Sequence, residues 1–160
     1  MSSVHAAVLA LQGSVEPHLR SLHASGVDPI EVRKPEQLAG VTHLIIPGGE
    51  STTLHHLFKL HGLDTLISDR VKEGSLALLG TCAGAILMGH HPDQAPPRLG
   101  LIDVDVDRNA YGRQVHSFVD QVEWNEGPGP GTSEGVFIRA PRFTRIGDSV
   151  NVLARERKIV

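Results

Sequence analysis

Cysteine is almost absent from this sequence of 160 residues, in which Cys82 is the single example. One cysteine excludes an internal disulfide and any metal site built from several thiolates. Cys82 is therefore either a small buried residue or a chemical reagent, and the choice between the two bears directly on function.

Long hydrophobic runs are also lacking. The longest purely apolar run covers residues 6–11, far short of the roughly 20 residues of a membrane-spanning helix, and no basic stretch precedes it as in a signal peptide. Neither sign of charge dominates, because 15 Lys and Arg face 18 Asp and Glu, and a net charge of −3 offers no basic surface to nucleic acid. We expect one cytoplasmic domain over residues 1–160 that binds neither nucleic acid nor membrane.

Histidine is the residue in excess, with ten copies. No two histidines are separated by four residues, the helical spacing that presents two imidazoles to one zinc ion. We interpret the histidines as scattered surface residues and expect no metal site.

Apolar runs alternate with segments of helical periodicity as far as about residue 90. Strands are predicted over residues 4–11, 30–32, 44–46 and 76–79, the first with the continuous apolar pattern of a strand buried on both faces. Helices are predicted after Ser14 as N-cap up to Gly26 as the left-handed C-terminal residue, with Pro17 in the first turn, and over about 52–60 and 63–72. This order predicts an α/β fold of three layers, a mostly parallel central sheet flanked by helices.

The second half of the chain has a different pattern. Apolar and polar residues alternate over 101–107, which is typical of half-exposed antiparallel strands, and residues 136–138 and 150–153 are further strand candidates. The segment 127–131, Gly-Pro-Gly-Pro-Gly, is expected to be a surface loop. We therefore expect additional antiparallel strands in the second half of the chain.

Cys82 lies in the sequence Gly80-Thr81-Cys82-Ala83-Gly84, directly after the last predicted parallel strand. Small flanking residues allow the strained turn of a nucleophile elbow, which holds a reactive atom at the start of a helix. The unpaired N–H groups at that position stabilise a thiolate and direct it at an incoming carbonyl carbon. The structural alternative is a buried cysteine in a glycine turn.

A second glycine loop, Pro47-Gly48-Gly49-Glu50-Ser51-Thr52, ends the neighbouring predicted strand. Glycine lets backbone N–H groups approach a ligand closely, so one of them could join the N–H of Ala83 in holding a negatively charged oxygen. The structural alternative is an ordinary turn capped by Ser51 or Thr52. Because both loops end adjacent strands, we expect them to form one site.

Five segments together resemble the glutaminase subunits of pyridoxal 5'-phosphate synthase, a family of class I glutamine amidotransferases. The two glycine loops belong to the resemblance, and the elbow alone would fit any class I amidotransferase. The remaining segments are Leu9-Ala10-Leu11-Gln12-Gly13, Arg108-Asn109-Ala110-Tyr111-Gly112-Arg113-Gln114 and Gly135-Val136-Phe137-Ile138-Arg139-Ala140-Pro141. The five occur in the family's order and span nearly the whole chain.

The resemblance implies hydrolysis of L-glutamine to L-glutamate and ammonia, with the ammonia delivered to a partner synthase subunit and with no cofactor or metal. It makes Cys82 the nucleophile that forms a glutamyl thioester, and Gly49 and Ala83 the oxyanion donors. The implied glutamine-binding residues are Gly49, Glu50, Ser51, Arg108, Ile138 and Arg139. An arginine suits the α-carboxylate, since its planar fork pairs with two oxygens, although both arginines would otherwise be read as surface ion pairs. Gln12 and Gly13 are expected at the interface with the synthase.

One element of the family pattern is not found in these 160 residues. In the family a His-Pro-Glu segment supplies the catalytic base and the carboxylate that orients it, and the sequence reaches Val160 without one. We therefore expect a chain that is truncated at its C-terminus and lacks the end of the fold, with an open strand edge. His116 is a weaker candidate for the base, because its segment has the pattern of a strand of unknown side-chain direction.

Three functional interpretations follow. The first is a glutaminase subunit whose sequence is incomplete. The second is a catalytically inactive subunit that binds glutamine and docks on the synthase. The third, a cysteine-elbow hydrolase or stress protein of the same fold, explains Cys82 but leaves the arginine segments unexplained. Activity that waits for docking would fit an oxyanion hole formed by a mobile Gly48–Gly49 peptide.

Overall fold

The computed structural model describes residues 4–90, 99–108, 118–126, 131–138 and 141–156. The chain divides into two compact units, Met1–Ile102 and Asp103–Val160, and each unit is described here by itself. Within the described ranges, no helix has both the length and the apolar character needed to cross a bilayer.

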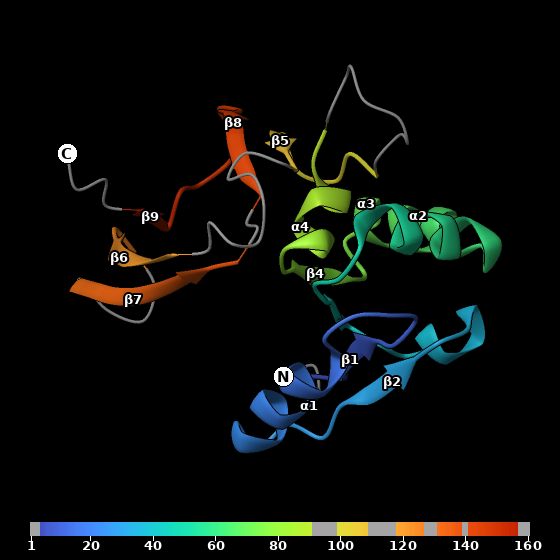
Figure 1. Cartoon of the computed structure of the whole chain (residues 1–160). Coiled ribbons are helices and arrows are strands. Elements are labelled where there is room, and N and C mark those ends of the chain that lie inside the picture. Colours follow the sequence, from blue (N-terminus) through green and yellow to red (C-terminus); the bar gives the residue numbers. More distant parts are fainter. Residues whose placement is uncertain (1–3, 91–98, 109–117, 127–130, 139–140, 157–160) are drawn as a thin grey trace. The chain divides into compact units, whose positions relative to one another are not determined.

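The first unit is built on a parallel sheet of four strands (Figure 1). The strands are β1 (Ala6–Leu9), β2 (Ile30–Val32), β3 (His43–Ile46) and β4 (Ala77–Gly80). Their order is β2-β1-β3-β4, and every pair is parallel. The four predicted strands are confirmed, and the first is shorter than the apolar run that predicted it, because Val4 lies outside the sheet with 58% exposure.

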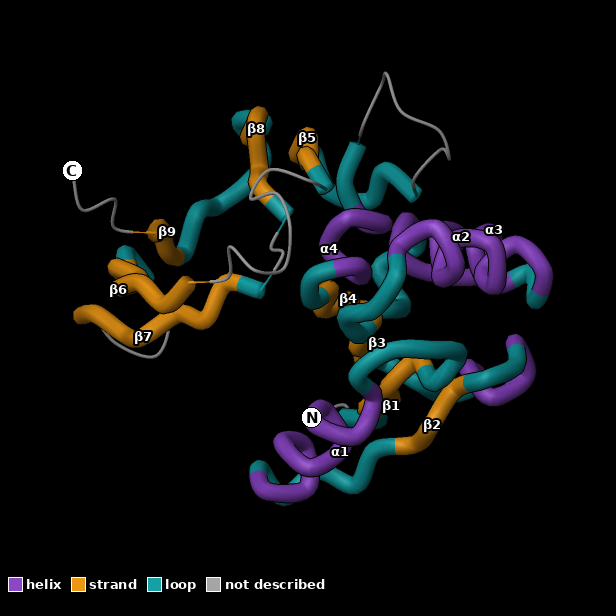
Figure 2. The backbone as a smooth tube through the Cα atoms, in the orientation of Figure 1, coloured by secondary structure: helices purple, strands orange, loops and turns teal. Residues whose placement is uncertain are grey.

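Helices follow the strands in turn (Figure 2). They are α1 (Val15–Ala24), the short 3₁₀ helix η1 (Pro35–Leu38), α2 (Ser51–Leu60), α3 (Leu63–Lys72) and α4 (Ala83–Met88). The predicted helix over 63–72 has the observed bounds, and the one predicted over 52–60 begins one residue earlier. The expected parallel α/β architecture is thereby confirmed.

The sheet has a buried apolar layer on each face. Ala7, Leu9, Leu44 and Ile46 belong to the main core together with side chains of α2, α3 and α4 such as Phe58. The alternate residues of β1, Ala6 and Val8, are also buried but lie outside that cluster, because successive side chains of a strand point to opposite faces. Helix α1 contacts β1 and lies across the sheet from α2 to α4 (Figure 1), which gives three layers.

Helix α1 begins and ends where its sequence predicts. Ser14 is the N-cap residue and Gly26, with φ +75°, follows the C-cap in the left-handed conformation. The Ser14 side chain makes no capping hydrogen bond, however. Its backbone N–H instead donates to the Gly48 carbonyl oxygen at 3.0 Å, so the start of the helix is held by the glycine loop of the neighbouring strand.

The second unit consists of antiparallel strands, as the alternating pattern predicts. Strand β5 (Val104–Asp107) pairs with β8 (Arg142–Ile146), and β6 (Phe118–Trp124) lies between β7 (Gly131–Phe137) and β9 (Ala154–Glu156). The strand expected over 150–153 was wrong: those residues belong to neither a strand nor a helix, and the strand begins at Ala154. Strands β6 and β8 had no prediction, because they are rich in polar residues and depend on their partners for hydrogen bonds.

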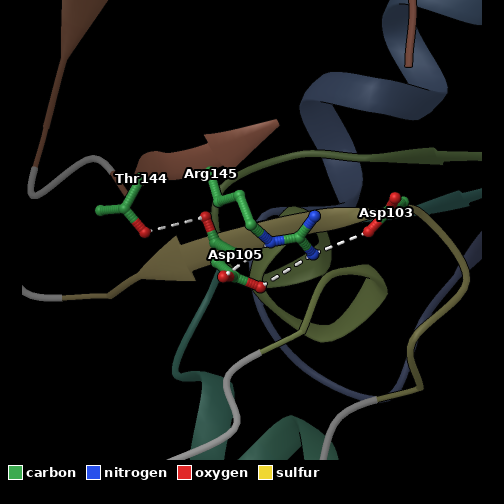
Figure 3. A network of polar contacts seen from close by, with 4 residues as sticks. All are labelled: Asp103, Asp105, Thr144 and Arg145. Atoms are coloured by element: carbon green, nitrogen blue, oxygen red, sulfur yellow. Dashed lines mark hydrogen bonds and ion pairs between the residues drawn. The ribbon is translucent and has the colours of Figure 1, made fainter. Parts of the chain in front are cut away.

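A charged cluster joins the two strands β5 and β8 (Figure 3). The Arg145 guanidinium donates to Asp103 at 2.7 Å and to Asp105 at 2.9 and 3.2 Å, and these two carboxylates raise the pKa of Arg145. The Thr144 hydroxyl donates to the Asp105 carbonyl oxygen at 3.3 Å. The alternating acidic residues that predicted a half-exposed strand therefore also supply partners to the opposite strand.

Candidate functional site

Two glycine loops leave the sheet side by side. The last residues of β3 and β4, Ile46 and Gly80, are paired in register, so the loops that follow both strands start at the same edge of the sheet. The N–H of Thr81 donates to the Ile46 carbonyl oxygen at 3.1 Å, which carries the pairing one residue beyond β4. The expectation that these two loops converge is confirmed.

Cys82 has the backbone conformation of a nucleophile elbow. Its φ of 48° and ψ of −106° are strained for a residue with a side chain, and no other non-glycine residue in the described ranges has a positive φ. The residue stands between β4 and α4 with an exposed thiol. The buried-filler alternative for Cys82 is therefore wrong.

Gly84 allows α4 to approach the sheet closely. A Cβ atom added at Gly84 would collide with the Ile46 carbonyl group, so a larger residue would push the first turn of α4 away from β3. Ala83, the first residue of α4, is fully buried. Its N–H belongs to the first turn of the helix, where backbone donors have no partner within the helix.

Gly48 is the part of the second loop that reaches the cysteine. A Cβ atom added at Gly48 would lie 3.2 Å from the Cys82 Cβ. The Gly48 carbonyl oxygen accepts the Ser14 N–H, and Gly13, with φ +93°, packs so closely on that carbonyl that it has no room for a side chain. Because a trans peptide directs its C=O and N–H to opposite sides, the Gly49 N–H points away from the Ser14 N–H.

The Gln12 side chain holds the same loop one residue further on. Its Nε2 donates to the Glu50 carbonyl oxygen at 3.2 Å, and its Oε1 accepts the Glu50 N–H at 3.3 Å. A Cβ atom added at Gly49 would lie 2.6 Å from the Gln12 Nε2. The segment 12–14 therefore contacts the loop at both ends of Gly49.

Glu50 is the N-cap residue of α2. Its carboxylate accepts the Thr52 N–H at 3.1 Å and the Thr53 N–H at 2.6 Å. The hydrogen bond from the Thr53 backbone is the main reason why the pKa of Glu50 is lowered, with a smaller contribution from Thr52. The structural alternative, a turn capped by Ser51 or Thr52, is wrong in its cap, since Ser51 is already the first helical residue.

His18 is a residue of this region that the sequence interpretation missed. Its Nε2 lies 3.1 Å from the Oγ1 of Thr81, the residue that precedes Cys82. Burial lowers the pKa of the imidazole. The available signal was its position on the apolar stripe of α1, three residues after Val15 and next to Leu19. The interpretation of all ten histidines as surface residues is wrong for His18, which is half-buried, and for His55, which is 7% exposed.

The remaining predicted site residues belong to the second unit or lie outside the described residues. Arg108 directly follows β5, and Ile138 follows β7 with 54% exposure. Arg139 and His116 lie outside the described residues. In the described part of the chain, no group of three or more His, Cys, Asp or Glu residues is arranged to hold a metal ion.

An α/β sheet with a cysteine elbow beside a glycine loop defines a class of cysteine-dependent enzymes, and the comparisons identify the family within it. The model of the SNO glutamine amidotransferase family matches residues 8–160. This chain belongs to that family, and it is a glutamine amidotransferase subunit.

Curated relatives and solved structures agree with this assignment. A "Pyridoxal 5'-phosphate synthase subunit PdxT" of Thermus thermophilus is 51% identical over 152 residues, which cover 92% of this chain and 77% of the relative. The same-named protein of Desulforamulus reducens is 47% identical over 155 residues, covering 96% and 81%. A crystal structure of a glutamine amidotransferase superposes with a TM-score of 0.85 at 49% identity, over 94% of this chain and 79% of that one.

Proposed function

We propose that this chain is the glutaminase subunit of a pyridoxal 5'-phosphate synthase, which hydrolyses L-glutamine to L-glutamate and ammonia and passes the ammonia to a synthase subunit. The observation that carries the proposal is the strained backbone of Cys82, held beside Gly48 in a chain of the SNO family. The names of the relatives support the choice of synthase as the partner. No cofactor or metal takes part in the proposed reaction.

In the proposed mechanism the Cys82 thiolate attacks the side-chain carboxamide carbon of glutamine. A C–S bond forms, and the carbonyl oxygen becomes an oxyanion that accepts hydrogen bonds from the N–H groups of Gly49 and Ala83. The C–N bond then breaks, the nitrogen leaves as ammonia after gaining a proton, and a glutamyl thioester remains. Attack by water on the thioester releases glutamate and restores the thiol.

The contacts of Gly48 and Glu50 support this assignment of the glycine loop. The Ser14 N–H and the Gln12 amide hold the loop on two sides and so restrain the Gly48–Gly49 peptide. Donors that are fixed in advance stabilise an oxyanion without reorganisation during the reaction. Since the polar groups of Glu50 already bond within the chain, we propose that Glu50 shapes the glutamine pocket and that Gly49 and Ser51 make its polar contacts.

We also propose that residues 1–160 form a single amidotransferase-like domain, because one family model matches residues 8–160. Arg108 and Arg139 would pair with the α-carboxylate of glutamine, and Ile138 would contact its carbon chain. Gln12 and Gly13 would contribute to the interface with the synthase. In the resembled family the proton relay uses a histidine and a glutamate, and we assign neither role to a described residue of this chain.

The test is ammonia release from glutamine by the chain extended with the family's His-Pro-Glu segment, with and without the synthase subunit. We expect hydrolysis that rises when the synthase is added and that Cys82→Ala abolishes. A glutamine-analogue electrophile should modify Cys82, as detected by mass spectrometry. An extended chain that stays inactive with its synthase would refute the proposal.

A second candidate is a subunit that binds glutamine and docks on the synthase without turnover. Calorimetric titration of the 160-residue chain with glutamine should then show binding without ammonia release. Steady hydrolysis by this chain would exclude the candidate.

A further inference from the structure

Helix α1 contacts the elbow through one side-chain hydrogen bond. The His18 Nε2 and the Thr81 Oγ1 are 3.1 Å apart, and both side chains are half-buried. Thr81 is also bonded through its backbone, since its N–H donates to the Ile46 carbonyl oxygen and its carbonyl oxygen accepts the Gly84 N–H at 2.9 Å. Thr81 is therefore held from three directions, by β3, α4 and α1.

This arrangement matters because the next residue, Cys82, has a strained backbone. A residue at φ 48° keeps that conformation only where the surrounding contacts leave it no alternative. The two backbone bonds of Thr81 come from elements adjoining the turn, whereas the His18 contact comes from a separate helix. His18 thus restricts a motion that the backbone bonds leave free, the rotation of the Thr81 side chain.

The same helix turn also holds the other loop of the site. Ser14 and His18 are four residues apart and so lie on one face of α1. The Ser14 N–H binds the Gly48 carbonyl oxygen at 3.0 Å, and His18 binds the Thr81 hydroxyl. The first turn of α1 is therefore bonded to both loops of the site, at Gly48 and at Thr81. It sets the distance between these two residues.

The chemistry of the imidazole suits this role. Burial lowers the pKa of His18, so the ring is neutral at neutral pH and its Nε2 accepts or donates according to the tautomer. The neighbouring residues of the stripe, Val15, Leu19 and Leu22, are apolar. An apolar residue would complete the stripe equally well, so packing alone does not call for a histidine at this position.

We propose that His18 is a positioning residue of the glutaminase reaction, whose hydrogen bond to Thr81 aligns the Cys82 thiol with the oxyanion donors. The inference rests on the proposed function of Cys82 as nucleophile. His18 contacts neither glutamine nor the reacting atoms in this role. Its loss is therefore expected to slow the chemical step and to leave glutamine binding nearly unchanged.

The experiment compares His18→Leu and Thr81→Val, which remove the hydrogen bond, with His18→Gln and Thr81→Ser, which keep a bonding group at the same position. His23→Leu is the matched control, because His23 is an exposed histidine of the same helix. The first readout is kcat and KM for glutamine in the active complex with the synthase. The second is the alkylation rate of the thiol by iodoacetamide, which reports on Cys82 alone because the chain has one cysteine.

We expect His18→Leu to lower kcat by about five- to tenfold, the equivalent of one hydrogen bond, with KM within about twofold of the parent value. His18→Gln should recover most of the loss, and alkylation of Cys82 should slow by a similar factor in His18→Leu. The double variant His18→Leu, Thr81→Val should be no slower than either single variant, because both remove the same contact.

Three results would overturn the proposal. One is a kcat and an alkylation rate of His18→Leu that match those of His23→Leu. Another is a loss in Thr81→Val that adds to that of His18→Leu. The third is a fall of His18→Leu to the level of Cys82→Ala, which would make His18 a catalytic base. If the parent complex itself proves inactive, the proposed function fails, and the alkylation rates still decide whether His18 positions Cys82.

Discussion

Replacement of His55 by methionine is expected to stabilise the first unit. His55 lies on the buried face of α2, is 7% exposed, and its Nδ1 has no hydrogen-bond partner within the described residues. A buried polar atom without a partner loses its hydration and gains nothing in return. Methionine is unbranched, favours helix and adapts to irregular space in a core, so it removes the polar atom without imposing a rigid new shape.

The magnitude follows from the one unsatisfied atom. Leaving a buried donor or acceptor unpaired costs about 1–3 kcal/mol, and imperfect repacking of a substituted core offsets part of this gain. We therefore expect His55→Met to raise the free energy of unfolding by about 1 kcal/mol at a pH where the imidazole is neutral. His56→Met, an exposed neighbour on the same helix, is the control and should change the stability by less than about 0.5 kcal/mol.

The advantage of His55→Met over the parent chain in free energy of unfolding should grow as the pH falls. Burial is the main reason why the pKa of His55 is lowered, and the charge of Lys59 lowers it further. Between the ordinary pKa of about 6.5 and the lower pKa of the folded chain, the unfolded chain binds more protons. The free energy of unfolding of the parent chain therefore falls as the pH drops from about 6.5 through the folded pKa, whereas His55→Met has no group that titrates there.

The assay is denaturant unfolding followed by far-ultraviolet circular dichroism at about pH 8 and about pH 5.5. All helices of the described residues belong to the first unit, whereas Trp124, the single tryptophan, reports on the second unit by fluorescence. We expect the two variants to share the fluorescence transition and to differ in the dichroism transition. A His55→Met chain that is less stable than the parent at both pH values, or whose advantage shrinks at low pH, would refute the reasoning.

Three further predictions concern the loops and strands. Gly84→Val should lower the melting temperature of the first unit and slow alkylation of Cys82, because its side chain would collide with the Ile46 carbonyl group; unchanged values would contradict the close approach of α4. Glu50→Ala should cost about 1 kcal/mol of stability through loss of the α2 cap, whereas Glu50→Asp keeps a capping carboxylate; equal losses would exclude a capping role. Arg145→Ala should lower the temperature of the fluorescence transition in low salt and less so in high salt, and a loss independent of salt would argue against ion pairing.

Local patterns were sufficient where one segment carries its own signal. The strands of the parallel sheet were predicted because strands buried on both faces are continuously apolar. Helix α1 was predicted from residues at its own ends, Ser14 and Gly26. The elbow at Cys82 was predicted because small residues on both sides of a reactive side chain permit the strained turn.

Local patterns failed where a segment depends on distant partners. Strands β6 and β8 mix polar with apolar residues and have exposed positions, so their extended form is stabilised by pairing across the sheet, which the sequence of either strand does not reveal. The segment 150–153 is the opposite case. Its apolar residues suggest a strand, but no neighbouring strand pairs with them in the described residues.

The candidate site divides along the same line. The sequence by itself determined which residue is the nucleophile candidate, which loops accompany it and to which family the chain is similar, because these depend on residue types at short spacing. Only the tertiary structure decided that Ser14 and Gln12 hold the glycine loop, that Glu50 caps α2, and that His18 reaches Thr81. Those contacts join residues that the chain brings together only when the sheet forms, and a hydrogen bond depends on distance and direction in space.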